Sequence, residues 1–330
     1  GQGQFSRFPK AVLEDEPYPV RGLMILGGSP VLSFPDSKSW REAYKKLDCL
    51  IVLDRYFTED ARYADVVFPA CSLFEVPKAV PGPEGPHIVE PLIEPVGESK
   101  NDVLIMGAIA KKLGFGDKLP QTEEELRSWL LSGTAPYAGD FGTSADQKKE
   151  KHYKKYETGE LRADGKPGFP TPSGKLEICS TILEENGFVP YPEYKDVRSI
   201  PGLAGKEYPF TMTSGARSNN RMGVFGANLD KIAEIEPYPF VDINEEDAKE
   251  IGIKDGDMVK VITPFADGTF KAKIRGIARH AIHIPHGGGS AYMAEPWKNG
   301  NVNDLCSLDY ADPMTGFVLI KSVPCRVEKV

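Results

Sequence analysis

Residues 206–264 read KEYPFTMTSGARSNNRMGVFGANLDKIAEIEPYPFVDINEEDAKEIGIKDGDMVKVITP. The apolar-rich run at 209–213 predicts a short strand that ends in the small-residue turn Ser214-Gly215. Asn244 predicts the start of a helix, because its side chain can accept hydrogen bonds from the N–H groups of the first turn. The acidic residues after Asn244 suit the positive end of a helix dipole, which supports the same boundary.

The second half of this stretch predicts a turn and another strand. The helix should stop near Gly252, since glycine adopts the left-handed backbone that often ends a helix. Asp255-Gly256-Asp257 is typical of a tight turn, and the alternating residues Met258–Ile262 predict a strand after it. A strand, a short helix, a tight turn and a second strand in so short a span favour a compact barrel over a doubly wound sheet.

Length and composition limit the possible function classes. A chain of 330 residues has room for two domains, since a domain usually holds roughly 100–200 residues. A net charge of −8 and a pI near 5.4 argue against nucleic acid as the main partner. No apolar run approaches the roughly 20 residues of a membrane span, so we expect no transmembrane segment.

The cysteines and histidines give no metal or nucleophile pattern. The sequence has five cysteines and no Cys-x-x-Cys pair, which predicts reduced, mostly buried thiols without a disulfide frame or an iron–sulfur site. His280, His283 and His286 are spaced by three. On a strand such residues point to opposite faces, so we expect no metal site there. No catalytic triad pattern and no Walker loop stand out, and we assign no catalytic residue.

The first part of the chain predicts two segments. Residues 1–20 are polar and proline-rich, and we expect an extended arm. Residues 21–131 predict an α/β unit with a parallel sheet, whose ligands bind at the carboxyl ends of the strands. The proline-rich segment 75–97 should be an irregular surface loop. Strands are expected at 22–26, 50–53 and 66–68, and helices at 38–47, 59–63, 102–113 and 123–131.

The second part predicts a linker and the barrel. Residues 132–205 are polar and irregular, and they include FPTPSGKLE at 169–177. Residues 206–330 should form the barrel domain. In it we expect a hairpin turn at Asp267-Gly268. Further strands are expected at 280–285, 317–321 and 323–330.

Three of these stretches resemble the molybdopterin oxidoreductases, the group of the dimethyl-sulfoxide reductases, formate dehydrogenases and polysulfide reductases. They are GGSPVLSFPD with LDRYFTEDARYADVVFPA at 27–70, TPSGKLE at 171–177 and INEEDAKEIGIKDGDMVKV at 243–261, in the order of that family. The resemblance implies an α/β parallel-sheet (Rossmann-like) domain followed by a six-stranded double-psi β-barrel. It also implies a bis(molybdopterin guanine dinucleotide) cofactor that carries molybdenum or tungsten.

This chain departs from the family pattern at named positions. Ser29 stands where the family often has Asn, and Asp60 stands where Thr is usual. In segment 75–97 the pattern Glu-x-x-Gly-x-x-x-Asn-x-x-x-Arg is largely lost. The barrel motif by itself is shared with other double-psi barrels, so the order of all three stretches carries the resemblance.

The resemblance also implies a set of cofactor-binding residues. A glycine-rich turn at Gly27 lets the backbone approach a pyrophosphate, and its alternative interpretation is an ordinary strand-to-helix turn. Asp54, at a strand end, can accept from the N1–H and 2-amino groups of guanine. Asp102 is alternatively a helix N-terminal charge, and the 213–222 loop a polar surface loop. The implied set is Gly27, Gly28, Ser29, Leu53, Asp54, Asp102, Thr213, Ser214, Gly215, Arg217, Ser218, Trp297, Asn303 and Lys321.

The family places its iron–sulfur cysteines and its metal ligand upstream of the region that this chain covers. The resemblance therefore implies the C-terminal, cofactor-binding part of an oxidoreductase. The implied partners are the N-terminal half of the same enzyme and an iron–sulfur electron-transfer subunit. The implied location is the prokaryotic cytoplasm or periplasm. Two alternatives stay open, a stand-alone cofactor-binding module without catalysis and a non-redox, hydratase-like member of the family.

Overall fold

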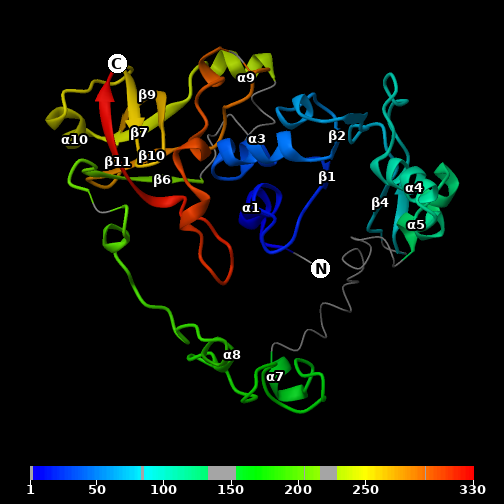
Figure 1. Ribbon diagram of the computed structural model, residues 1–330. Helices are drawn as coiled ribbons and strands as arrows, with labels where there is room; N and C mark the ends of the chain where they lie inside the picture. Colours follow the sequence, from blue (N-terminus) through cyan, green and yellow to red (C-terminus); the bar gives the residue numbers. More distant parts are fainter. Residues whose placement is uncertain (1–2, 83–84, 133–153, 204, 216–228, 294) are drawn as a thin grey trace.

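The computed structural model describes residues 3–82, 85–132, 154–203, 205–215, 229–293 and 295–330. Within these ranges the strands form a three-stranded parallel sheet, a two-stranded sheet and a closed six-stranded barrel (Figure 1). The parallel sheet and the barrel each have a separate hydrophobic core.

The α/β unit is built on the predicted parallel sheet. Strand order is β1-β2-β3, with β2 in the centre and Leu26 of β1 opposite Leu53 of β2. Val52 and Trp40 are buried between the sheet and the helices beside it. The predicted strands and helices are confirmed to within a residue or two. They are β1 (Gly22–Leu26), α3 (Ser37–Lys46), β2 (Cys49–Asp54), η2 (Asp60–Arg62) and β3 (Val66–Pro69). The short helix α2 (Pro30–Ser33) was not predicted.

The N-terminal segment corrects one prediction, because it is not an extended arm. It forms η1 (Phe5–Arg7) and α1 (Phe8–Leu13), and α1 packs against α3. Pro9 stands in the first turn of α1, where proline needs no backbone N–H partner and its fixed φ suits a helix. The Phe8 ring stacks on Trp40 at 5.2 Å between centroids, so apolar burial holds the helix in place.

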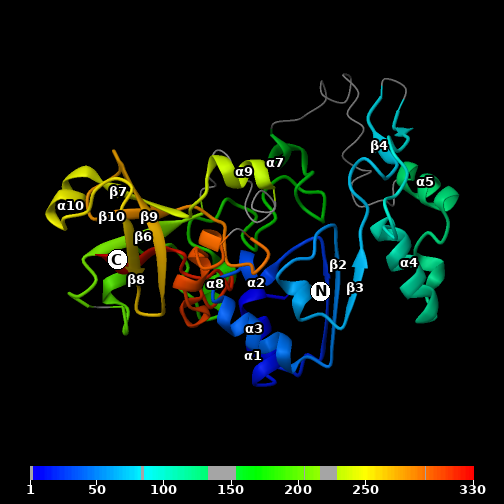
Figure 2. The same ribbon diagram turned by 90° about the horizontal axis from the view of Figure 1, so that it is seen from above.

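The proline-rich segment corrects a second prediction, because it contains regular structure. Strands β4 (Lys78–Val80) and β5 (His87–Val89) pair antiparallel within it. The prolines stand outside these strands and leave the ladder donors in place. Beside this hairpin lie α4 (Asp102–Lys112), η3 (Gly116–Lys118) and α5 (Glu123–Leu131), beyond β3 (Figure 2).

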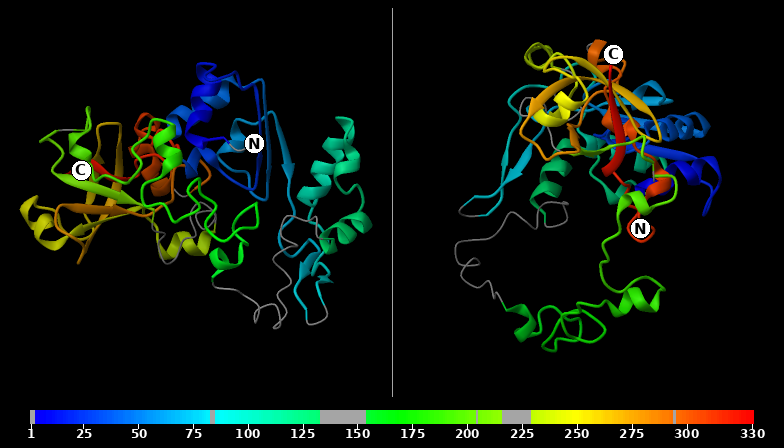
Figure 3. Two further views of the ribbon diagram at one scale, coloured as in Figure 1. Left: turned by 90° about the horizontal axis from the view of Figure 1, so that it is seen from below. Right: turned by 90° about the vertical axis from the view of Figure 1, so that its left-hand side faces the viewer.

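The linker follows a separate path from the two cores. Its described residues contain only short helices, namely α7 (Lys155–Thr158), α8 (Thr181–Glu185) and η5 (Val197–Ser199). Figures 1 and 3 show α7 and α8 apart from both the sheet and the barrel. The irregular character predicted for this region is therefore confirmed where it is described.

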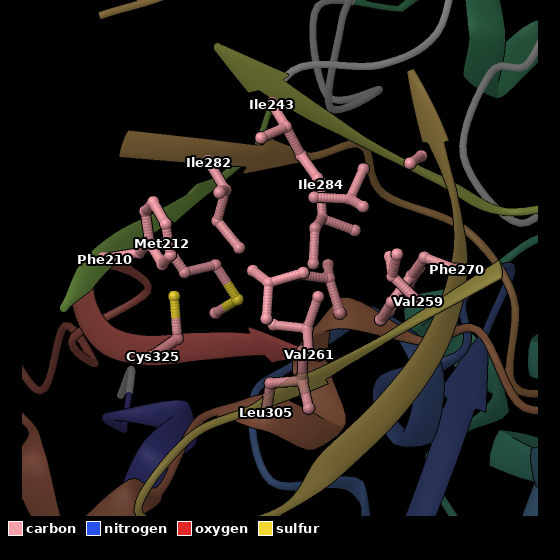
Figure 4. Close-up of a cluster of buried hydrophobic side chains, with 14 of the residues drawn as sticks. Phe210, Met212, Ile243, Val259, Val261, Phe270, Ile282, Ile284, Leu305 and Cys325 are labelled. Carbon is pink, nitrogen blue, oxygen red and sulfur yellow. The ribbon is translucent and has the colours of Figure 1, made fainter. Parts of the chain in front are cut away.

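The C-terminal part forms the closed barrel, in the order β10-β6-β11-β8-β9-β7. Alternate residues of its strands point inward, and Met212, Phe270 and Ile282 are fully buried among them (Figure 4). The strands are β6 (Phe210–Ser214), β7 (Phe240–Asn244), β8 (Met258–Ile262), β9 (Asp267–Arg275), β10 (Ala281–Ile284) and β11 (Lys321–Lys329). The helices are α9 (Asp230–Ile235), α10 (Glu245–Glu250), η7 (Glu295–Trp297), η8 (Val302–Leu305) and η9 (Leu308–Tyr310).

The local signals of the barrel stretch are confirmed. The Asn244 side chain accepts hydrogen bonds from the N–H groups of Glu246 and Asp247 and starts α10. Gly252 follows the end of α10 with φ +71°, and Gly256 has φ +86° in the turn before β8. These residues act through their own neighbours in the chain, which is why the sequence predicts them.

Two strand boundaries in the barrel differ from the prediction. Asp267 and Gly268 belong to β9, and Ile262 pairs with Asp267. The turn between β8 and β9 lies at 263–266, where the Thr263 hydroxyl accepts from the N–H groups of Phe265 and Ala266. Residues 317–321 form no partner strand for β11, because β11 pairs with β6 and β8 instead.

Candidate functional site

A pocket lies at the carboxyl end of the parallel sheet. Its volume is about 370 Å³. It is lined by Gly27 after β1, Asp54 at the end of β2 and Ala70 after β3. Asn101 and Asp102 close one side at the start of α4. In open α/β sheets, the ligand site lies at the carboxyl ends of the strands, as this pocket does. The structure thus brings together three predicted residues, Gly27, Asp54 and Asp102.

The turn after β1 can accept a close ligand at its backbone. The Gly27 N–H donates to the Leu53 carbonyl at 2.9 Å, and its φ of +59° favours glycine. A Cβ at Gly28 would meet no atom within 4 Å, so this position faces open space. Leu53 itself is fully buried, and only its backbone can serve the site. Ser29 is buried and turned inward, because its hydroxyl donates to the Asp60 carboxylate.

Asp60 does not line the pocket but supports the turn after β1, a role that the sequence did not reveal. Its carboxylate is fully buried and accepts from the Tyr44 hydroxyl at 2.7 Å and from the Val31 N–H at 3.1 Å. Burial raises the pKa of Asp60 above its usual value. The Ser29 hydroxyl is a third donor, so Asp60 fixes the turn between β1 and α2 through hydrogen bonds to Ser29 and Val31. The sequence offered one sign of this role, namely that position 60 has Asp where the family usually has Thr.

Two carboxylates, Asp54 and Asp102, line the pocket. Asp54 accepts from the Tyr56 N–H at 3.0 Å and is half-buried. The pKa of Asp102 is raised, first by burial and then by the nearby charge of Asp54. A ligand with N–H donors would relieve this repulsion, because each carboxylate could then accept a hydrogen bond. The two carboxylates therefore favour a ligand group that presents N–H donors.

Glu75 organises the rim of the pocket and was not among the predicted residues. Its carboxylate accepts from the Ser72 N–H at 2.5 Å, the Val96 N–H at 2.6 Å and the Ser99 hydroxyl at 3.2 Å. The hydrogen bonds from Ser72 and Val96 hold the pKa of Glu75 at about 2. Glu75 thereby joins the chain after β3 to the chain before α4.

The Glu75 interaction predicts a defined pH dependence. Because the pKa falls from 4.5 to about 2 on folding, ionised Glu75 stabilises the fold above pH 4.5. This contribution should be lost as the pH falls from 4.5 toward 2. The free energy of unfolding of the wild type and of Glu75→Gln should therefore differ at neutral pH and converge in acid. A difference that is constant over this range would contradict the assignment.

The predicted barrel residues meet at one end of β6. Thr213 pairs with Lys321 of β11, and the Ser214 hydroxyl donates to the Ile320 carbonyl at 3.0 Å. Gly215 has φ +110°, and a Cβ there would lie 3.9 Å from Lys321 Cε and 4.0 Å from His286 Nε2. A glycine, an ammonium group and an imidazole thus lie side by side, a set that suits phosphate oxygens. Arg217 and Ser218 lie outside the described residues.

Trp297 and Asn303 join the barrel to the α/β unit. The Trp297 indole N–H donates to the Glu236 carbonyl at 2.9 Å, and Trp297 is buried in the core of the α/β unit. The Asn303 side-chain N–H donates to the Leu32 carbonyl at 2.7 Å. Both residues therefore have a structural role, and a direct contact with a ligand stays a prediction.

The cysteines and histidines have individual surroundings. Burial raises the pKa of the Cys306 and Cys325 thiols to about 12, as expected for inert core residues. Cys49 and Cys179 are exposed, so the prediction of mostly buried thiols is wrong for them. His283 Nδ1 lies 3.0 Å from Asp242 Oδ2 of the neighbouring strand β7. In the described ranges, no helix has the length and apolar character of a bilayer span.

Comparisons with known proteins give two matching family models, one on each core. The family model of the molydopterin dinucleotide binding domain matches residues 211–324, and that of molybdopterin oxidoreductase matches residues 8–112. The F420-dependent formate dehydrogenase subunit alpha of Methanocaldococcus jannaschii is 31% identical over 81% of this chain and 38% of the relative. The probable oxidoreductase YoaE of Bacillus subtilis is 31% identical over 76% of this chain and 36% of the relative.

A solved structure shares the fold of this chain. Acetylene hydratase from Pelobacter acetylenicus superposes with a TM-score of 0.78 at 20% identity, covering 100% of this chain and 47% of that chain. The chain spans less than half the length of each of these proteins. Two family models in the expected order, one on each core, decide the assignment. The chain belongs to the molybdopterin oxidoreductase family and carries its dinucleotide-binding domain.

Proposed function

We propose that this chain is the C-terminal, cofactor-binding part of a molybdopterin-dependent oxidoreductase. The observation that carries the proposal is the pocket at the sheet end, where Gly27 presents backbone and Asp54 and Asp102 present carboxylates. One guanine dinucleotide arm of a bis(molybdopterin guanine dinucleotide) cofactor would bind there. The second would bind at the barrel end, beside Gly215 and Lys321.

The residues present indicate which roles belong to the cofactor and which to this chain. The cofactor, with molybdenum or tungsten, would supply two-electron redox chemistry. The residues of this chain would bind and orient its two arms, with Asp60 and Glu75 holding the loops that line the first pocket. The α/β unit would be of the Rossmann-like type. The barrel, with its parallel pairs β6–β10 and β7–β9, would be of the double-psi type.

The remaining parts of the enzyme would lie in other segments. The N-terminal half would supply the metal ligand and the iron–sulfur cluster, and an iron–sulfur subunit would exchange electrons with it. A formate dehydrogenase subunit and two probable oxidoreductases match this chain at 30–31% identity, which supports a redox function. Acetylene hydratase of Syntrophotalea acetylenica matches at 24% identity, so the experiment below includes a hydration assay.

The test starts with the reading frame upstream of Gly1 and with the enzyme purified from the complete frame. A Cys-x2-Cys-x3-Cys cluster motif, followed by a Cys, selenocysteine, Ser or Asp ligand, is expected upstream. The purified enzyme should release two guanosine monophosphates per chain on acid hydrolysis, contain one molybdenum or tungsten atom and reduce or oxidise a redox dye. A preparation without guanine nucleotide and metal would contradict the proposal, and hydration without dye turnover would favour the hydratase alternative.

A further inference from the structure

A second cavity lies between the N-terminal helices and the last part of the chain. Its volume is about 250 Å³, and its walls come from η1 and α1, from the start of α3 and from η9. None of its lining residues lines the pocket at the sheet end. Most of its lining side chains are polar or charged. These side chains, which define what we call the junction cavity, include Ser6, Arg7, Lys10, Asp36, Ser39 and Asp309.

Ser6 gives the junction cavity a buried hydroxyl group that lacks a partner. Ser6 is only 5% exposed, and among the described residues its Oγ has no hydrogen-bond partner. Folded proteins pair nearly all of their buried polar atoms, because an unpaired atom loses its bonds to water without a replacement. The Ser6 hydroxyl therefore indicates a ligand in the cavity that presents an oxygen acceptor.

The negative side of the cavity is held in place by the fold. The Asp36 carboxylate accepts from the Ser39 N–H at 3.1 Å and from the Leu308 N–H at 3.4 Å. The Asp36 N–H in turn donates to the Asn303 carbonyl at 2.9 Å. Each carboxylate oxygen can accept a further hydrogen bond, so Asp36 can still bind an N–H donor. Asp309 also lines the cavity and adds a second carboxylate.

The positive side of the cavity comes from η1 and α1. The Lys10 ammonium is already paired, because it lies 2.9 Å from the Glu16 carboxylate and 3.6 Å from the Glu14 carboxylate. The Arg7 guanidinium makes no hydrogen bond or ion pair with any residue that the structure describes. Arg7 therefore keeps its N–H donors for a ligand, and their planar arrangement matches the two oxygens of a carboxylate.

Charges of both signs around one small cavity determine the class of ligand that it fits. A simple anion would be repelled by Asp36 and Asp309, and a simple cation would leave Arg7 without a partner. A molecule with an ammonium group and a carboxylate can pair with both sides at once. The cavity of about 250 Å³ is smaller than the roughly 300 Å³ at which sites for drug-sized ligands begin, so the molecule must be small.

We propose that the junction cavity binds a small zwitterion of the α-amino acid type. Its ammonium group donates to the Asp36 and Asp309 carboxylates. Its carboxylate accepts from the Arg7 guanidinium and from the Ser6 hydroxyl. The ligand thereby links η1 to η9, two segments far apart in the chain, and it stabilises the folded enzyme by mass action. The proposal is independent of the nucleotide pocket and of the proposed redox function.

Calorimetric titration of the full-length enzyme with glycine, alanine and serine tests the proposal. At least one of them should bind at one site per chain and raise the melting temperature until the site is saturated. Acetate and methylammonium carry the two charges separately. Each should bind at least about tenfold more weakly, because it lacks the charge-assisted hydrogen bonds of the other group. If none of the three amino acids binds, or if acetate binds as tightly as they do, the proposal is wrong.

Single substitutions show whether the binding occurs in this cavity. Arg7→Gln and Asp309→Asn replace exposed side chains, so both variants should melt as the wild type does. Both should bind the amino acid at least about tenfold more weakly. The matched control is Arg21→Gln, because Arg21 is exposed and its guanidinium pairs with Asp15 at 2.8 Å outside the cavity. The control should bind as the wild type does, and equal affinity in all three variants would overturn the proposal.

Ser6→Ala tests the unpaired hydroxyl separately. Without ligand, this variant should melt at or above the wild-type temperature, because a hydroxyl without a partner does not stabilise the fold. Its affinity for the amino acid should fall about tenfold, since one hydrogen bond to the ligand carboxylate is missing. A lower melting temperature without ligand, or an unchanged affinity, would contradict the role proposed for Ser6.

Discussion

Replacing Asp54 with asparagine in the full-length enzyme is expected to weaken retention of the guanine nucleotide by about tenfold to a hundredfold. A hydrogen bond to a charged group contributes about 1.5–3 kcal/mol, and the amide offers one acceptor where the carboxylate offers two. The fold should remain, because the amide oxygen of the new side chain can still accept from the Tyr56 N–H, as Asp54 does at 3.0 Å. Guanosine monophosphate released per chain, after dialysis at rising dilution, measures the effect.

Asp65→Asn provides the matched control for Asp54. Asp65 also accepts a backbone N–H, from Leu50 at 2.7 Å, but it precedes β3 at the opposite end of the same sheet. The control should keep its nucleotide. If Asp54→Asn and Asp65→Asn retain the nucleotide equally well, Asp54 does not contact the guanine, and the assignment of the pocket to that arm is wrong.

Replacing Phe270 with alanine is expected to cost about 3–5 kcal/mol of the free energy of unfolding. Phe270 is fully buried in the barrel core, and the cavity left by its ring cannot be filled without movement of β8 and β9 (Figure 4). A loss of this size is a large fraction of the about 5–15 kcal/mol that stabilises a typical domain. Denaturation followed by circular dichroism measures it.

Phe57→Ala is the control for the size of the side chain. Phe57 is 54% exposed and its ring meets Tyr292 edge-on at 5.4 Å between centroids, so its removal should cost only about 0.5–1.5 kcal/mol of the free energy of unfolding. If Phe270→Ala were as mild as Phe57→Ala, the barrel would tolerate the cavity. The interior packing described here would then not be what stabilises that domain.

The elements that were predicted correctly depend on neighbours in the chain. Asn244 caps α10 with its own side chain, and the alternation in Met258–Ile262 places one face of β8 in the core. The predictions were wrong where contacts between residues far apart in the sequence determine the local structure. Residues 1–20 were predicted as an extended arm because their prolines favour extended chain, yet the Phe8 ring stacks on Trp40 and residues 5–13 are helical.

The residues of the candidate site also fall into two groups, those named from the sequence and those found only in the structure. Gly27, Asp54 and Asp102 were named from their places at strand and helix ends, and the parallel sheet brings all three to one pocket. The roles of Asp60 and Glu75 became visible only in the folded chain. Asp60 binds Ser29 across 31 positions, and Glu75 binds Val96 across 21. Arg217 and Ser218 remain predictions.

The amino-acid sequence alone determined the two-part organisation, most element types and the family, because periodicity, caps and turn residues act over a few positions. The tertiary structure decided which carboxylates are buried, which loops they hold and which apolar side chains stay exposed. Burial and long-range hydrogen bonds depend on the distance in space between residues far apart in the chain. A pattern read along the chain contains no measure of that distance.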